Sequence, residues 1–232
     1  MTQIKVCGLQ PGDDLRFTAA ASVSHTGVVF VPRSKRYVKP TDVPAMLSGI
    51  DPLTRTMAVF ANQGVEDMLQ VLKTSGIRGA QLHGSESTDV CQRLKSEGYE
   101  VWKALRVGQG NELSAATLLE QSSLFADAVD GLLYDATPPK HADPSVTGGH
   151  GVTFEWSVLS SLSGFAQTYK HLSLWVAGGL TPENVGDLLR VFQPTGVDVS
   201  SGVERLGRKD SKQISAFIEA VKQGDQVSSL SH

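Results

Sequence analysis

The chain has 232 residues and a net charge of -3; 40% of its residues are hydrophobic and 19% are charged. This composition is ordinary for a soluble globular protein, and the weak charge gives no reason to expect a nucleic-acid partner. No apolar run approaches the roughly 20 residues of a membrane-spanning helix, and residues 1–5 do not resemble a signal peptide. We therefore expect no membrane partner. Two cysteines do not make a disulfide scaffold, which favours a reducing compartment, so we expect a cytoplasmic protein.

Short runs of apolar and β-branched residues recur eight times along the chain, and amphipathic stretches separate most of them. Each run is too short for an independent helix and is followed by turn-forming residues, which is typical of buried strands. Eight strands with crossovers of helical length predict a closed (β/α)8 TIM barrel, for which about 250 residues are usual. The expected strands are Ile4–Cys7, Gly27–Val31, Thr56–Phe60, Gly79–His83, Glu100–Leu105, Gly131–Asp135, Leu172–Ala177 and Val197–Ser200.

The stretches between the strands carry apolar residues at helical spacing. One helix is expected around Val65–Leu72, another contains Cys91, and a third begins with Thr181 as its N-cap and Pro182 at its first position. The last helix is expected over residues 211–222, with one apolar face.

An open doubly wound sheet is the alternative fold. It usually shows a glycine-rich nucleotide fingerprint after its first strand, and the glycine spacing after Cys7 does not fit one. No linker divides the chain. We therefore predict a single barrel domain over residues 1–223 and a flexible tail over residues 224–232.

Two candidate catalytic side chains end separate strands. Cys7 closes the first strand and is followed by Gly8, and Asp135 closes the sixth strand. Parallel α/β folds collect their chemistry at the C-terminal ends of strands, so a thiol and a carboxyl there could face one cavity as base and acid. Cysteine in a strand is more often a core residue, and aspartate at a strand end is often a loop cap, so neither alone identifies a site.

An anion site is predicted after the last two strands. Gly178 and Gly179 follow the seventh strand, and Ser200, Ser201 and Gly202 follow the eighth. Glycines let backbone N–H groups approach a ligand closely, and serine hydroxyls add donors. TIM barrels often bind phosphate with these two loops and a short extra helix. We therefore expect this end of the barrel to bind a phosphate group.

Eight short motifs at the strand ends are modest signals individually, but their joint order and spacing are highly specific. They are Lys5-Val6-Cys7-Gly8-Leu9, Pro32-x-Ser34-x-Arg36-Tyr37-Val38, Val59-Phe60-Ala61-Asn62, Gln81-Leu82-His83-Gly84, Leu133-Tyr134-Asp135-Ala136, Gly148-Gly149-x-Gly151-x-x-Phe154-x-Trp156, Ala177-Gly178-Gly179-Leu180-x-Pro182-x-Asn184-Val185 and Asp198-Val199-Ser200-Ser201-Gly202-Val203-Glu204. Together they resemble the phosphoribosylanthranilate isomerase family of tryptophan biosynthesis, over nearly the whole chain.

The resemblance implies an Amadori rearrangement. N-(5-phosphoribosyl)anthranilate, an aldose amine, would become 1-(2-carboxyphenylamino)-1-deoxyribulose 5-phosphate, a ketose amine. The reaction needs an acid to open the furanose ring and a base to take the C2 proton of the Schiff base. The resemblance implies Asp135 as the acid and Cys7 as the base. A positive group near Cys7 would favour its thiolate, since a free thiol has a pKa of about 8.5.

Three further side chains are candidates for substrate binding. Arg36 could make a two-pronged contact with the anthranilate carboxylate, although it also lies in a basic surface run. His83 ends the fourth strand and either lines the site or serves only the structure. Asp198 points into the barrel with Ser200 and either contacts the ribose hydroxyls or only pairs with Lys5.

Several residues are interpreted as having no functional role or as departures from the family pattern. Cys91 is interpreted as a core residue. Departures from the family pattern occur at Gln10, Tyr134, His150 and Val152. They leave every catalytic group in place but do not decide whether the loop closes as in the family. The residues interpreted as solvated surface are Glu204, Arg205 and Lys209.

Two alternative functions stay open on this reasoning. One is a related aminoaldose-phosphate isomerase of histidine biosynthesis, which usually has aspartate rather than cysteine as the base after the first strand. The other is a non-catalytic phosphosugar-binding barrel. We expect a small phosphosugar substrate and neither a metal nor a cofactor. A monomer is the default expectation and a homodimer the alternative.

Overall fold

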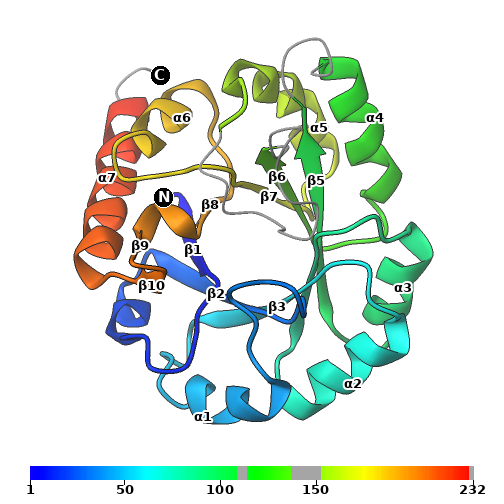
Figure 1. The fold of residues 1–232 in the computed structure, drawn as a ribbon. Coiled ribbons are helices and arrows are strands. Elements are labelled where there is room, and N and C mark those ends of the chain that lie inside the picture. Colours follow the sequence, from blue (N-terminus) through cyan, green and yellow to red (C-terminus); the bar gives the residue numbers. More distant parts are fainter. Residues whose placement is uncertain (109–113, 137–152, 230–232) are drawn as a thin grey trace.

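The structure is a computed structural model that describes residues 1–108, 114–136 and 153–229. Its eight longer strands are all parallel and close into a barrel in chain order, with the first strand paired to the last (Figure 1). The predicted (β/α)8 barrel is therefore confirmed. The strands are β1 (Gln3–Cys7), β2 (Val23–Val29), β3 (Arg55–Phe60), β4 (Gly79–Leu82), β5 (Glu100–Val107), β6 (Gly131–Ala136), β7 (Ser173–Val176) and β8 (Gly196–Val199).

Helices surround the barrel and cover its outer face (Figure 1). Between β1 and β2 the described crossover contains only the short 3-10 helix Arg16–Ala19. A 3-10 turn at Ser201–Val203 follows β8 and leads into a small antiparallel hairpin of β9 (Glu204–Arg205) and β10 (Arg208–Lys209). The α-helices are α1 (Val43–Leu47), α2 (Val65–Ser75), α3 (Thr88–Ser96), α4 (Ala115–Phe125), α5 (Leu162–Thr168), α6 (Val185–Val191) and α7 (Ser211–Ser229).

Strand β2 begins at Val23, earlier than the expected start at Gly27. Residues 23–26 include polar side chains, so the sequence pattern did not indicate a buried strand there. These polar residues have partners inside the protein. The Thr26 hydroxyl lies 2.9 Å from the Thr56 hydroxyl on β3. The His25 ring packs against two tryptophan rings at centroid distances of 4.8 and 5.0 Å. Polar residues thus occupy a buried strand because the neighbouring strands satisfy them.

Two helix ends differ from the sequence-based expectation. Helix α6 begins at Val185, because Thr181 caps a preceding turn instead: its side-chain oxygen accepts a hydrogen bond from the Glu183 N–H at 3.2 Å. Helix α7 continues to Ser229, so residues 224–229 are helical rather than part of the expected tail. Asp225 in this extension accepts two hydrogen bonds from Thr2, at 2.6 and 2.7 Å, which attach the helix to the start of the chain.

The apolar core has an outer layer between strands and helices and an inner layer inside the barrel. The outer layer includes Leu72, Leu94 and Phe217. Inside the barrel, Trp102 and Trp175 are fully buried with ring centroids 4.5 Å apart. Burying side chains of this size contributes several kcal/mol to folding, at ~25 cal/mol per Å² of apolar area. The interior of the barrel is therefore packed around these two rings.

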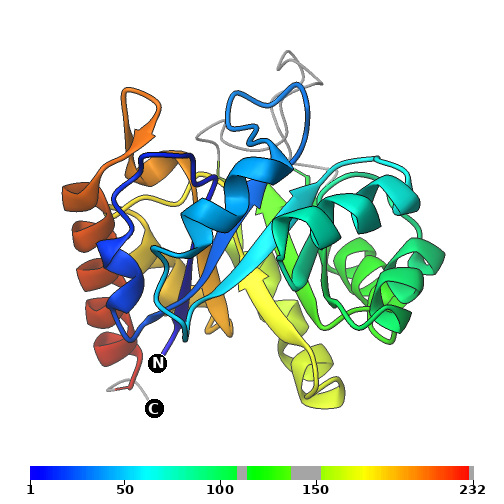
Figure 2. The same cartoon turned by 90° about the horizontal axis from the view of Figure 1, so that it is seen from below.

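The two ends of the barrel differ in character. The β9–β10 hairpin and the loop after β2 rise from one end, and both chain termini lie at the other (Figure 2). The end with the hairpin is the C-terminal end of the strands, where chemistry in this fold is expected. Among the described helices, none is long and apolar enough to cross a membrane.

Candidate active site

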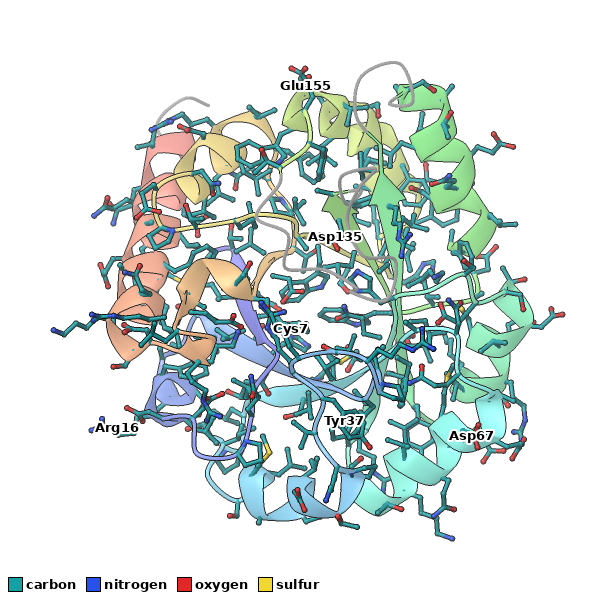
Figure 3. All side chains as sticks on the ribbon, in the orientation of Figure 1. Cys7, Arg16, Tyr37, Asp67, Asp135 and Glu155 are labelled. Atoms are coloured by element: carbon teal, nitrogen blue, oxygen red, sulfur yellow. The ribbon has the colours of Figure 1, made fainter. Side chains whose placement is uncertain are left out.

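A cavity opens among the C-terminal ends of the strands. Figure 3 shows Cys7 and Asp135 toward the middle of the ring of strands. Every site residue predicted from the sequence lines this cavity except Gly202. The predicted residues brought together are Cys7, Arg36, His83, Asp135, Gly178, Gly179, Asp198, Ser200 and Ser201, and the further lining residues are Val29, Ser34, Val59, Gln81, Ala177 and Leu180.

Cys7 lies at the end of β1 with only 8% of its surface exposed. A Cβ placed on Gly27, in the neighbouring strand, would lie 2.7 Å from Cys7 Sγ and 3.0 Å from Lys5 Nζ. Both groups therefore occupy the space that a side chain at Gly27 would need. Burial raises the pKa of the Cys7 thiol, while the Lys5 ammonium acts in the opposite direction.

Asp198 both lines the cavity and pairs with Lys5 inside the barrel. Its Oδ1 atom lies 3.0 Å from Lys5 Nζ, and both side chains are almost completely buried. The two sequence-based interpretations of Asp198 are thus geometrically compatible. One carboxylate oxygen holds the lysine, and the residue still faces the space where a ligand would lie.

Asp135 ends β6 and is joined to a short chain of hydrogen bonds. Its Oδ2 atom lies 2.9 Å from His83 Nε2, and His83 Nδ1 lies 3.1 Å from Gln81 Nε2. With the Gln81 amide in this orientation, Nδ1 accepts, so a neutral His83 carries its proton on Nε2 and donates to Asp135. Gln81 was not predicted, although its position two residues before His83 on one strand places both side chains on the same face.

Arg36 is buried and makes a two-pronged ion pair with Glu204. Arg36 Nε and Nη2 donate to the two carboxylate oxygens at 2.6 and 2.8 Å, and Lys209 Nζ lies 2.9 Å from the same carboxylate. Among the described residues, Arg36 Nη1 has no partner. Burial alone would raise the pKa of Glu204, but hydrogen bonds from Arg36 and the charge of Lys209 bring it down to about 2.

The interpretation of Glu204 and Lys209 as solvated surface was wrong. The β9–β10 hairpin folds back at the C-terminal end of the barrel, so both side chains turn inward next to Arg36. Lys209 Nζ also donates to the Ser200 carbonyl at 3.0 Å. A two-residue turn at Leu206 and Gly207, both with positive φ, makes this hairpin, and the sequence signal was only one glycine among charged residues.

The predicted phosphate loops lie beside one another. Gly178 and Gly179 have φ values of +89° and +61°, and a Cβ on Gly178 would lie 2.5 Å from the Ala136 nitrogen. The Ser200 hydroxyl donates to the Cys7 carbonyl at 3.0 Å. Gly202 packs against the β7 loop instead of lining the cavity, because a Cβ there would lie 1.9 Å from the Leu180 carbonyl oxygen.

Free backbone donors gather at these loops. Within the described part of the chain, the N–H groups of Gly179, Ser201 and Gly202 donate to no acceptor. Backbone N–H groups without an internal partner are available to a ligand. Three of them on adjoining loops can hold a phosphate without a lysine or arginine.

Two departures from the family pattern have different outcomes. Tyr134 points away from the cavity, since its hydroxyl lies 3.0 Å from the Ser122 hydroxyl on α4, so it does not obstruct the site. The departures at His150 and Val152 lie outside the described residues.

Comparisons with known proteins point to one family. The family model described as N-(5′-phosphoribosyl)anthranilate (PRA) isomerase matches residues 4–220. A relative of that name from Rhodospirillum rubrum is 37% identical over 233 residues, covering 96% of this chain and 99% of the relative. Another from Microcystis aeruginosa is 34% identical over 223 residues, covering 95% and 97%.

Solved structures give the same result. The crystal structure of phosphoribosyl anthranilate isomerase from Thermotoga maritima superposes with a TM-score of 0.78 at 30% identity, covering 96% of this chain and all of that one. A second structure of such an isomerase holds reduced 1-(o-carboxyphenylamino)-1-deoxyribulose 5-phosphate, with a TM-score of 0.75, 29% identity and the same coverage. A third contains monomers generated from the dimeric Thermotoga maritima enzyme. The chain belongs to the N-(5′-phosphoribosyl)anthranilate isomerase family.

Proposed function

We propose that Cys7 and Asp135 are the base and the acid with which this isomerase of tryptophan biosynthesis rearranges N-(5′-phosphoribosyl)anthranilate. The observation that carries this assignment is their shared cavity. A thiol from β1 and a carboxyl from β6, strands that are not neighbours in the barrel, line the same space. A small sugar between them can meet both groups at once, which acid–base catalysis requires.

The proposed reaction proceeds through a series of proton transfers at the sugar. Asp135, in its protonated form, gives a proton to the ribose ring oxygen, which opens the ring and leaves a Schiff base at C1. Cys7, as the thiolate, takes the proton from C2 and leaves an enol–enamine. The product forms when C1 takes up a proton and the C2 hydroxyl loses one. His83, which contacts Asp135 at 2.9 Å, orients the acid for this transfer.

The ends of the substrate fit the groups around these two residues. The Arg36 guanidinium, with Nη1 facing no partner among the described residues, binds the anthranilate carboxylate. The phosphate lies against the free N–H groups of Gly179 and Ser201, with Gly178 allowing the close approach of the loop.

Two other proposed roles complete the binding site. Ser200 and Ser201 line the phosphate end, and Ser200 also holds the end of β1 through the Cys7 carbonyl. Asp198 accepts a hydrogen bond from a ribose hydroxyl with the oxygen that does not pair with Lys5. These contacts place the sugar carbons between Cys7 and Asp135.

We propose a monomeric enzyme, because the most exposed large apolar side chains lie on separate segments of the chain: Met1, Leu53, Leu124 and Leu206. Light scattering after size-exclusion chromatography tests this. A mass near 25 kDa supports the monomer, and a mass near twice that value shows a homodimer.

The roles of Cys7 and Asp135 are tested by turnover of freshly made substrate, followed as a change in anthranilate fluorescence. We expect Cys7→Ala and Asp135→Asn each to lower kcat by about 10²- to 10⁴-fold without loss of fold. Cys91→Ala, which removes the other thiol from helix α3, is the matched control and should keep full activity. Turnover that survives in the Cys7→Ala/Asp135→Asn double variant would reject the assignment.

A further inference from the structure

Charged side chains around Cys7 form a nearly balanced buried group with one positive charge in excess. With the proposed acid Asp135 protonated and therefore uncharged, cations outnumber carboxylates by one, so the loss of the Cys7 proton would make the group neutral. The unmatched positive charge favours the thiolate wherever water is excluded. The members of the group are Lys5, Arg36, Lys209, Asp198 and Glu204.

Of the three cations in this group, Lys5 is the one best placed to stabilise a Cys7 thiolate. It has no exposed surface and lies two residues before Cys7 on β1, so both side chains point into the barrel. Its ammonium and the Cys7 sulfur flank the same empty position at Gly27, at 3.0 and 2.7 Å from a Cβ placed there. The side chain therefore ends beside the sulfur and beneath the substrate cavity.

The other two cations, Arg36 and Lys209, make their main contacts with other groups. Arg36 directs two nitrogens to Glu204, and Lys209 donates to Glu204 and to the Ser200 carbonyl. Lys209 acts on Cys7 more weakly than Lys5 does. Lys5 is thus the cation that interacts most strongly with the Cys7 sulfur.

Asp198 keeps Lys5 charged and in place. Burial alone would lower the pKa of the Lys5 ammonium, but the Asp198 carboxylate at 3.0 Å and the Cys7 sulfur outweigh burial and raise it. The ammonium therefore persists through the neutral pH range. The carboxylate opposes the thiolate as well, but it acts on Cys7 less than Lys5 does.

We propose that Lys5 is a positioning residue for the isomerase reaction, which stabilises the thiolate form of Cys7 against the cost of burial so that it can take the C2 proton. This inference rests on the proposed role of Cys7 as the base. It assigns to Lys5 an electrostatic task separate from barrel packing. Its consequence is that removal of the ammonium moves the ionisation of Cys7 to higher pH.

The test measures thiolate formation directly. In a Cys91→Ala background, Cys7 is the only thiol, and its alkylation rate by iodoacetamide is recorded against pH. We expect Lys5→Met to move the midpoint of this profile upward by about one unit or more, which is about tenfold slower alkylation at neutral pH. Lys5→Arg, which keeps the charge, should stay closer to the unsubstituted profile.

The same variants are compared in turnover. The acidic limb of kcat/KM should move upward with the alkylation midpoint in Lys5→Met, so activity recovers at high pH. A role in packing alone would lower activity equally at every pH. If Lys5→Met does not fold because Asp198 is left unpaired, the Lys5→Met/Asp198→Asn variant is measured, and its midpoint should still lie above that of the unsubstituted protein.

The outcome separates this inference from the proposed function. An unchanged alkylation midpoint in folded Lys5→Met, or in the double variant, overturns the role of Lys5. Full activity of Cys7→Ala would overturn the role of Cys7 as base, whatever the alkylation profile shows. An upward shift in both the alkylation and the kinetic profiles supports both.

Discussion

Gly202 offers the sharpest geometric test of the proposed phosphate site. A Cβ at this position would lie 1.9 Å from the Leu180 carbonyl oxygen and 2.9 Å from the Leu180 carbonyl carbon. A Cβ atom essentially never lies under 3.0 Å from a non-bonded heavy atom, so Gly202→Ala must move one loop by about 1 Å or more. The obstructing atoms belong to the backbone, which cannot turn aside as a side chain can.

The expected effect follows from that displacement. Overpacking of this kind costs about 1–3 kcal/mol of stability, or about 2–12 °C in Tm for a chain of this length. Moving the phosphate donors of Gly179 and Ser201 by about 1 Å misplaces the sugar against Cys7 and Asp135. A misplacement of that size lowers the rate by about 10²-fold.

The assay is steady-state turnover measured beside thermal melting. Gly202→Ala should stay folded, lose about 10²-fold in kcat/KM and lose most of its stabilisation by inorganic phosphate. Gly164→Ala is the matched control: this exposed position in α5 has nothing within 4 Å of a Cβ, so the variant should be fully active and slightly more stable. Unchanged kcat/KM and phosphate protection in folded Gly202→Ala would refute the reasoning.

Other features of the site make further predictions. The Glu204 pKa of about 2 lies below its unfolded value near 4.5. Its ion pairs therefore stabilise the protein fully above pH 4.5, and this stabilisation is lost as pH falls towards 2. In urea unfolding over this pH window, Glu204→Gln should lose about 1–3 kcal/mol less stability than the unsubstituted protein. Lys103→Met should lower the free energy of unfolding by about 3–5 kcal/mol by removing the ion-pair partner of the buried Glu86 carboxylate, now 3.0 Å away, and a loss under 1 kcal/mol would contradict this. Gln81→Leu should reduce kcat about tenfold with little change in KM by releasing His83, and an unchanged kcat would remove its orienting role.

The sequence was sufficient for the barrel and for most of the residues around the cavity. Strand ends are marked locally by an apolar run followed by glycine or a polar residue, as at Cys7 and Asp135. In a closed parallel barrel, these ends meet at one rim whatever their separation in the chain. The site residues could therefore be grouped without knowledge of any distance between them.

The parts that sequence reasoning missed depend on contacts between distant segments. His25 reads as a loop residue until the rings of Trp102 and Trp175 are placed beside it. Glu204 and Lys209 read as surface charges, because only the returning hairpin brings them to Arg36. Partners far apart in sequence determine whether such polar residues are buried, and no local pattern records them.

The most direct test of the central claim is a crystal structure of this protein with the reduced product, 1-(o-carboxyphenylamino)-1-deoxyribulose 5-phosphate. We predict the Cys7 sulfur and an Asp135 carboxylate oxygen within hydrogen-bond reach, about 3 Å, of the C1–C2 region, from opposite sides of the sugar chain. The phosphate should contact Gly179 and Ser201. A ligand seated with Cys7 or Asp135 out of reach of these carbons would contradict the account.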